Sequence, residues 1–205
     1  MGHNVTTVIP IFGDTKYWAP LAVMAEESAY AAGSYQVLIT SGGTLAEARN
    51  NGLALVDTEF VCFLDADDTL APNYFNEVFS GPDPFDVAVP SAQYFSHENK
   101  TAPTFLRVLG HNHSACSPAC LSDGNYIVIG APVRTSMAVD VKGFKDFAWC
   151  EDWDFWLRLR SRGAAFKNCP NAVYQAHKRP GSRNNIDDET ASALSFLILR
   201  SNGLA

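Results

Sequence analysis

Three carboxylates follow a short apolar run in the first third of the chain. Asp65, Asp67 and Asp68 come directly after residues 60–64, Phe-Val-Cys-Phe-Leu, a run that is typical of a buried strand. A helix cap would account for one acid here, but three crowded carboxylates are costly to keep ionised without a cation. Their oxygens suit a divalent metal, and open α/β sheets bind ligands at strand ends. The spacing therefore predicts a metal-assisted site for a phosphorylated substrate.

A second acidic group, Glu151, Asp152 and Asp154, stands at the start of an amphipathic stretch over residues 149–162. Acids at a helix N-terminus are favourable in themselves, which gives one interpretation. Four large rings share the stretch: Trp149, Trp153, Phe155 and Trp156. Because apolar surroundings raise a carboxyl pKa toward neutrality, the second interpretation is a general base at this position.

His177 precedes a basic segment with one glycine, residues 178–185, which includes Arg183. A single histidine is more often structural than a ligand. Here it leads a loop whose arginines could clamp phosphate oxygens, so we expect a phosphate or metal role for it.

The five cysteines are scattered and odd in number, which argues against a disulfide framework. Two of them fall in a segment with two histidines, and the four residues concerned are His111, His113, Cys116 and Cys120. A structural zinc site is one interpretation, but the spacing matches no common zinc module, so an ordinary loop is favoured. We interpret the cysteines as reduced thiols in a cytoplasmic protein.

Apolar periodicity predicts the elements that must position these groups. Strands are expected at 5–11, 35–40, 60–64, 85–90 (continuing at 93–95), 126–130 and 172–177, and helices at 17–32, 45–56, 72–80, 132–141, 149–162 and 190–200. Residues 97–124 are expected to form a long loop with a short helix at 104–109. The alternating order of the first third predicts an α/β fold with a parallel sheet, whose carboxyl edge would collect Asp14, Thr40 and the acids after residue 64.

The composition fits one soluble domain. The chain has 205 residues, of which 47% are hydrophobic, and a net charge of -7. That charge does not favour general binding to nucleic acid or to an anionic membrane. No signal peptide and no apolar run long enough to span a bilayer is evident, so we expect a cytoplasmic protein without a membrane span.

Several motifs in one order resemble the family 2 glycosyltransferases of the GT-A fold. They are Val8-Ile9-Pro10, residues 48–54 (Ala-Arg-Asn-Asn-Gly-Leu-Ala), residues 63–68 (Phe-Leu-Asp-Ala-Asp-Asp), Gly143-Phe144 and residues 151–154 (Glu-Asp-Trp-Asp). The resemblance runs from about residue 5 to residue 183. It implies a Rossmann-like, mostly parallel central sheet flanked by helices, in one domain over 1–205. The nucleotide would bind to residues 1–95 and the acceptor to residues 96–205.

The resemblance also implies a role for each motif residue. Asp65 would contact the nucleotide ribose, and Asp67 would hold Mn²⁺ or Mg²⁺ on the donor diphosphate. Asp152 matches the catalytic base of an inverting, single-displacement transfer, with Glu151 orienting it or helping to hold the acceptor. The remaining implied site residues are Pro10, Thr40 and Arg49 beside the nucleotide, His177 supporting the metal or diphosphate, and Arg183 in the loop that follows.

Two departures from the family pattern concern the nucleotide. Thr40-Ser41-Gly42-Gly43 stands where relatives carry an acidic residue that reads the base, and the chain then passes almost directly to Arg49 without the usual extra helix and strand. The chain is therefore expected to be a compact variant with a smaller nucleotide subsite. A UDP-sugar remains the expected donor, and a soluble acceptor is favoured.

Two other functions fit part of the sequence. Asp65-x-Asp67-x-Thr69-Leu70 matches the signature of haloacid-dehalogenase-type phosphatases, with Asp65 as nucleophile. That motif normally opens its fold, whereas two strand–helix units precede it here. A catalytically silent protein that binds sugar nucleotides is the other alternative, and the acids retained in both clusters argue against it.

Overall fold

The computed structural model describes residues 3–96, 104–109, 121–179 and 187–204. Its strands are β1 (His3–Ile11), β2 (Ser34–Ser41), β3 (Phe60–Phe63), β4 (Thr69–Leu70), β5 (Val87–Ser96), β6 (Thr104–Leu109), β7 (Val133–Arg134) and β8 (Phe166–Lys178). Its helices are α1 (Thr15–Ala31), α2 (Leu45–Leu53), α3 (Tyr74–Val78), α4 (Thr135–Asp140), α5 (Glu151–Ser161) and α6 (Asp188–Ser201).

One twisted sheet runs through the molecule in the order β2-β1-β3-β7-β5-β8-β4, with β6 paired to β5. Three pairings are parallel and contain most of the paired residues: β1 pairs with both β2 and β3, and β5 pairs with β8. The short strand β7 joins the two halves by antiparallel pairing with β3 and β5. This is the α/β class, with a mostly parallel core, that the sequence predicts.

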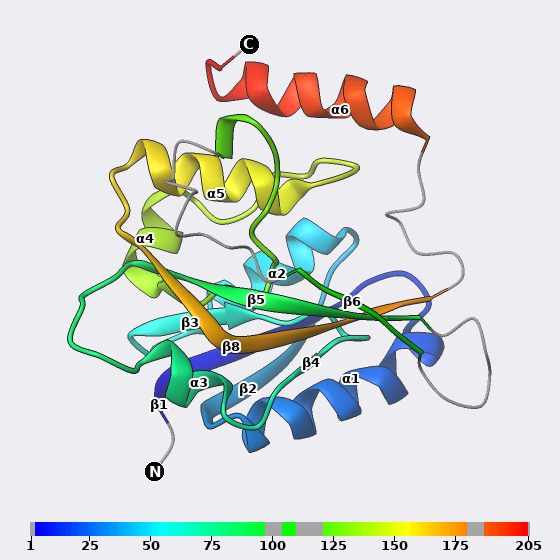
Figure 1. Cartoon of the computed structure of the whole chain (residues 1–205). Coiled ribbons are helices and arrows are strands. Elements are labelled where there is room, and N and C mark those ends of the chain that lie inside the picture. The colour runs from blue at the N-terminus through cyan, green and yellow to red at the C-terminus, as the bar shows by residue number, and fades with distance from the viewer. Residues whose placement is uncertain (1–2, 97–103, 110–120, 180–186, 205) are drawn as a thin grey trace.

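Helices cover both faces of the sheet (Figure 1). In that view α1 lies below the sheet, α2, α4 and α5 lie above it, and α6 lies over α5. Aromatic rings join the sheet to α5, because Phe144 packs against Phe63 with ring centroids 4.8 Å apart and against Phe155 at 4.3 Å. The core therefore ties the end of β3 to the helix that begins at Glu151.

The strand predicted at 126–130 is wrong, because these residues form turns and bends. Ile127 and Ile129 are buried, which explains their apolar alternation. Their segment satisfies its backbone through side chains instead of a ladder: Trp156 Nε1 donates to the Ile127 carbonyl at 3.1 Å, and the Tyr74 hydroxyl donates to the Gly130 carbonyl at 2.7 Å. Alternation thus reported burial and not strand pairing.

The helix predicted at 104–109 is also wrong, because these residues form β6, antiparallel to β5. The β-branched and aromatic residues there suit a strand better than a short isolated helix. The other predicted helices are present at slightly different ends, and the short strands β4 and β7 were not predicted. Within the described ranges no helix is long and apolar enough to cross a membrane.

Candidate active site

The turn after β3 places the first carboxylates at the carboxyl edge of the parallel strands. Leu64 N donates to the Val8 carbonyl at 2.9 Å and continues the pairing with β1 for one residue. The chain then turns, with Asp68 N donating to the Asp65 carbonyl at 3.0 Å. Asp65 keeps 35% of its side chain exposed, whereas Asp68 is buried. The same turn therefore exposes the carboxylate of Asp65 to solvent and buries that of Asp68.

Arg49 joins the two acidic groups that the sequence singles out. Its Nη2 donates to Asp65 Oδ1 at 2.7 Å, and its Nη1 forms a short ion pair with Glu151. The guanidinium carbon lies 5.1 Å from the centre of the Phe144 ring. Burial opposes the charge on Arg49, but the carboxylates of Asp65 and Glu151 outweigh it and raise the pKa of Arg49. The arginine is therefore a permanent buried cation between β3 and α5.

Asp152 lies next to this pair and has the properties of a base. Burial, followed by the charge of Glu151, raises the pKa of Asp152 to about 7, although the charge of Arg49 acts in the opposite direction. Asn125 Nδ2 donates to Asp152 Oδ1 at 3.1 Å, and the backbone N–H of Trp153 donates to the same oxygen at 2.9 Å. A partly exposed carboxylate of this pKa can accept a proton near neutral pH.

Asp67 is the acid best suited to hold a metal ion. Its side chain is 22% exposed, and burial together with the charge of Asp65 raises its pKa to about 6. The nearest cationic group is Arg179, whose Nε lies 3.8 Å from Asp67 Oδ2 and has no hydrogen-bond partner among the described residues. The carboxylate thus carries a charge that the protein compensates only weakly, so a divalent cation with oxygen ligands fits here.

Asp68 and His177 hold β8 against the turn. The Tyr174 hydroxyl donates to Asp68 Oδ2 at 2.5 Å, and the backbone N–H of His177 donates to Asp68 Oδ1 at 2.7 Å. The His177 ring stacks on Phe95, with centroids 5.2 Å apart, and its Nε2 lies 3.3 Å from Thr69 Oγ1. Burial raises the pKa of Asp68 well above its ordinary value, and the charge of Asp67 adds to this. His177 therefore reaches the turn through its backbone as well as its ring.

Pro10 and Thr40 lie side by side at the ends of β1 and β2. Thr40 Oγ1 donates to the Ala48 carbonyl at 2.7 Å and so holds the start of α2. Asp14, expected at the same edge, caps α1 by accepting from Lys16 N at 3.0 Å. Arg183 lies outside the described residues, as do the histidines and cysteines of segment 111–120.

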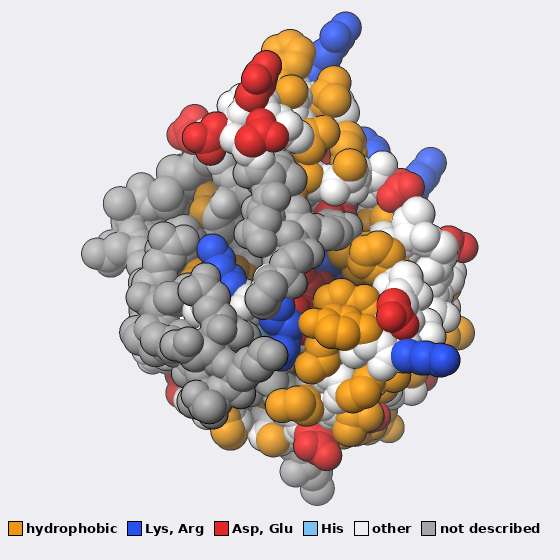
Figure 2. Space-filling model, turned by 90° about the vertical axis from the view of Figure 1, so that its right-hand side faces the viewer, with side chains coloured by type: hydrophobic (Ala, Val, Ile, Leu, Met, Phe, Trp, Pro, Cys, Tyr) orange, Lys and Arg blue, Asp and Glu red, His pale blue; other side chains and the backbone are white. Residues whose placement is uncertain are grey.

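Within the described ranges no group of three His, Cys, Asp or Glu side chains is arranged to bind a metal ion. A metal at Asp67 would thus need further oxygen ligands from a substrate, as a diphosphate provides. Figure 2 views the molecule from the right-hand side of Figure 1 and shows Lys or Arg side chains close to Asp or Glu side chains near the middle of that face.

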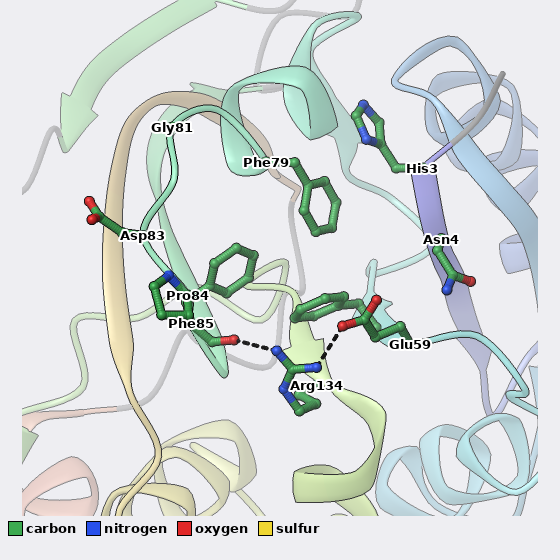
Figure 3. A pocket seen from close by; sticks show the side chains of 10 residues that line it. His3, Asn4, Glu59, Phe79, Gly81, Asp83, Pro84, Phe85 and Arg134 are labelled. Carbon is green, nitrogen blue, oxygen red and sulfur yellow. Dashed lines mark hydrogen bonds and ion pairs between the residues drawn. The ribbon is translucent and has the colours of Figure 1, made fainter.

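A hollow of about 330 Å³ lies at the opposite, amino edge of the strands and takes no part in this site. Figure 3 shows Arg134 inside it, pointing to Glu59 and to the backbone of Phe85. Arg134 donates to Glu59 Oε1 at 2.7 Å, to Asp86 Oδ1 at 3.0 Å and to the Phe85 carbonyl at 3.0 Å. Its donors are engaged with the protein, so we interpret this arginine as a structural clamp.

Sequence reasoning missed several residues that build the site. Asn50 and Asn125 are hydrogen-bonded to Phe144 and Asp152, and Tyr174 is hydrogen-bonded to Asp68. Asn50 lies within the motif at residues 48–54, next to Arg49, and this position was the one signal that could have identified it. Asn125 and Tyr174 carried no local signal, because their partners are distant in the sequence.

Known proteins resemble this chain in part of its sequence and in its fold. The family model described as glycosyl transferase family 2 matches residues 26–115. No curated protein matches the chain. Among solved structures, S. aureus TarS residues 1–349 in complex with UDP-GlcNAc matches with a TM-score of 0.57 at 16% identity, over 98% of this chain and 66% of that one.

Two further solved structures agree. A structure of S. aureus TarS matches with a TM-score of 0.61 at 14% identity, over 98% of this chain and 39% of that one. The mannosyltransferase PcManGT from Pyrobaculum calidifontis, in complex with GDP-Man and Mn²⁺, matches with a TM-score of 0.56 at 14% identity, over 85% of this chain and 57% of that one. This chain thus spans 39–66% of the length of these proteins.

The fold is that of GT-A glycosyltransferases, and the family match falls on the part of the chain that carries Arg49 and the acids after β3. The resemblance to family 2 glycosyltransferases is therefore supported by a sequence match over residues 26–115 and by a fold shared with glycosyltransferases of known structure.

Proposed function

We propose that the chain is an inverting, metal-dependent glycosyltransferase that moves a sugar from a nucleotide-sugar donor to an acceptor hydroxyl. One observation carries the proposal: Arg49 bonds both Asp65, which faces the donor side, and Glu151, which precedes the base Asp152. Under this proposal, the donor site and the base would lie on either side of one buried cation, Arg49. The pKa of Asp152, about 7, suits a group that must take a proton at neutral pH.

The chain's residues divide the reaction between them. Asp65 would accept hydrogen bonds from the donor ribose, and Asp67, with His177 nearby, would hold Mn²⁺ or Mg²⁺. A bound cation neutralises charge on the leaving group. Asp152 takes the proton of the acceptor hydroxyl. At the same time the hydroxyl oxygen bonds to the anomeric carbon, and the bond between that carbon and the diphosphate oxygen breaks. Because the attack is on the face opposite the leaving group, the anomeric configuration inverts.

The donor we propose is a UDP-sugar. Structures with this fold include one holding UDP-GlcNAc and another holding GDP-Man and Mn²⁺. In this chain Thr40 occupies the expected base-reading position and offers no carboxylate. Its hydroxyl is already bonded to the Ala48 carbonyl. The base must be recognised by other groups near Pro10 and Arg49. A soluble acceptor and a cytoplasmic location complete the proposal.

The test is donor turnover. We expect the protein to hydrolyse one nucleotide-sugar of a UDP- and GDP-sugar panel slowly when Mn²⁺ is present, and to lose this activity when the metal is chelated. Phosphate release from an aryl phosphate that Asp65→Asn abolishes would instead identify a phosphatase. Donor binding without turnover, with every acceptor supplied, would identify a silent binding protein.

A further inference from the structure

The strand β2 forms an open edge of the sheet. It is the first strand in the order β2-β1-β3-β7-β5-β8-β4, and its one sheet partner among the described strands is β1. From Gln36 to Ser41 it pairs regularly with Thr6 to Ile11, so the edge is straight along six residues. A straight edge presents a row of backbone N–H and C=O groups that can pair with another strand.

Within the part of the chain that the structure describes, β2 lacks several features that usually prevent such pairing. Native sheets protect an edge with lysine, proline, a bulge on the strand or a covering segment. The sequence of β2, Ser-Tyr-Gln-Val-Leu-Ile-Thr-Ser, contains no proline and no charged residue. All eight described strands are already placed in the sheet, so none of them remains to cover β2.

Apolar side chains are exposed on β2 and on the helices that pack beside it. Both α1 and α2 contact β2. The exposed large side chains of β2 and α1 are Tyr35 (68%), Ile39 (41%), Tyr17 (49%), Val23 (47%), Met24 (58%) and Tyr30 (51%), and Leu55 (63%) follows the end of α2. Tyr35 and Ile39 lie on β2 itself, so an apolar contact at this edge would begin with them.

We propose that β2 pairs with β2 of a second copy of this chain, antiparallel across a two-fold axis, so that the two sheets become continuous. A two-fold interface brings one surface against itself, which suits an uncharged strand that would repel no identical strand. The chain carries a net charge of -7, yet residues 17–41 contain two charged side chains, Glu26 and Glu27. This edge is therefore a place where two negatively charged copies can approach.

Sedimentation of the whole chain tests the proposal. Between about 1 and 100 µM we expect the mass to rise from 22.3 kDa toward twice that value. Ile39→Lys and Tyr35→Lys each place a charge on the edge and should keep the protein at the monomer mass over the same range. Phe196→Lys, which changes an exposed aromatic residue on α6, is the matched control and should dimerise as the natural chain does.

Hydrogen exchange of the unaltered chain avoids any effect of a variant on folding. The amides of residues 36–41 that face the open edge should exchange more slowly at the highest protein concentration than at the lowest, while amides in α6 should not change. A monomer mass at every concentration would overturn the proposal. So would a dimer that persists in folded Ile39→Lys, or one that dissociates in Phe196→Lys.

Discussion

The side chain of Asn50 is hydrogen-bonded to both backbone groups of Phe144. Asn50 Nδ2 donates to the Phe144 carbonyl at 2.8 Å, and the Phe144 N–H donates to Asn50 Oδ1 at 2.8 Å. The preceding residue, Gly143, has a φ of +63°, and a Cβ added there would lie 2.2 Å from Asn50 Oδ1. The contact therefore requires glycine at 143. It fixes α2, which carries Arg49, to the segment that leads into α5.

Asn50→Ala should destabilise the protein and slow the reaction. The variant leaves a partly buried N–H and C=O without partners, so we expect the free energy of unfolding to fall by about 1–3 kcal/mol. The rate should fall as well, because Arg49 and Glu151 lose their fixed spacing. Urea unfolding and kcat measure the two effects. Asn51→Ala is the matched control: it removes an exposed bond to the Ser41 carbonyl, and its unfolding free energy should change by less than about 0.5 kcal/mol. Equal losses of unfolding free energy in the two variants would show that the hydrogen bonds between Asn50 and Phe144 have no special role.

Arg49→Met should cost more stability than any surface substitution. It leaves buried Glu151 without a cation, so we expect a loss of about 3–5 kcal/mol in the free energy of unfolding. Adding Glu151→Leu to Arg49→Met should restore part of that stability, because the uncompensated charge is removed. Urea unfolding of the two single variants and the double variant measures the coupling. Additive losses would show that the two residues do not act as a pair.

Local patterns predicted the elements that carry the site. The buried strand β3 could be predicted from its apolar run, and the partly buried helix α5 from its amphipathic pattern. In both cases the signal lies within the element itself. Arg49 was placed by the resemblance, but its bond to Glu151 spans 102 positions and has no local signature. The same holds for Tyr174 and Asp68, which lie 106 positions apart.

Segment 126–130 shows why apolar alternation alone can mislead. Ile127 and Ile129 are buried as strand residues would be, yet the backbone around them is bonded to Trp156, Tyr74 and Cys62 side chains. Whether an alternating segment pairs in a sheet depends on which donors reach it. That is decided by residues elsewhere in the chain.

The pH dependence of the reaction should report Asp152. A base must be ionised, and burial with the charge of Glu151 raises its pKa to about 7, so kcat/KM should rise with pH up to about 7 and then level. Asp152→Asn should lower kcat about 10²–10⁴-fold, leave the donor Kd unchanged and abolish this limb of the profile. Initial rates across pH, with calorimetric donor titrations, provide the measurements. A variant that keeps the same limb would exclude Asp152 as the base.

The same pKa shift has a consequence for stability. The folded state holds the Asp152 proton more tightly than the unfolded chain, in which the pKa is near 3.8, so folding loses stability as pH rises from about 4 to about 7. Asp152→Asn cannot ionise, and its stability relative to the natural protein should therefore increase over that range. Urea unfolding of both proteins at several pH values checks this. A difference that is constant with pH would mean that Asp152 is not shifted.

Asp67→Asn should weaken binding of the metal and, through it, of the donor. The substitution keeps the size of the side chain but removes the charge that Arg179 approaches only to 3.8 Å, so the affinity for Mn²⁺ in the presence of donor should fall by at least roughly tenfold. Paramagnetic titration of Mn²⁺ and calorimetric titration of the donor measure the two affinities. Asp83→Asn is the matched control, because Asp83 is an exposed acid at the hollow on the opposite edge of the sheet. If both variants bind Mn²⁺ and donor as the natural protein does, Asp67 is not a metal ligand, and the turn after β3 would hold the diphosphate through Arg179 alone.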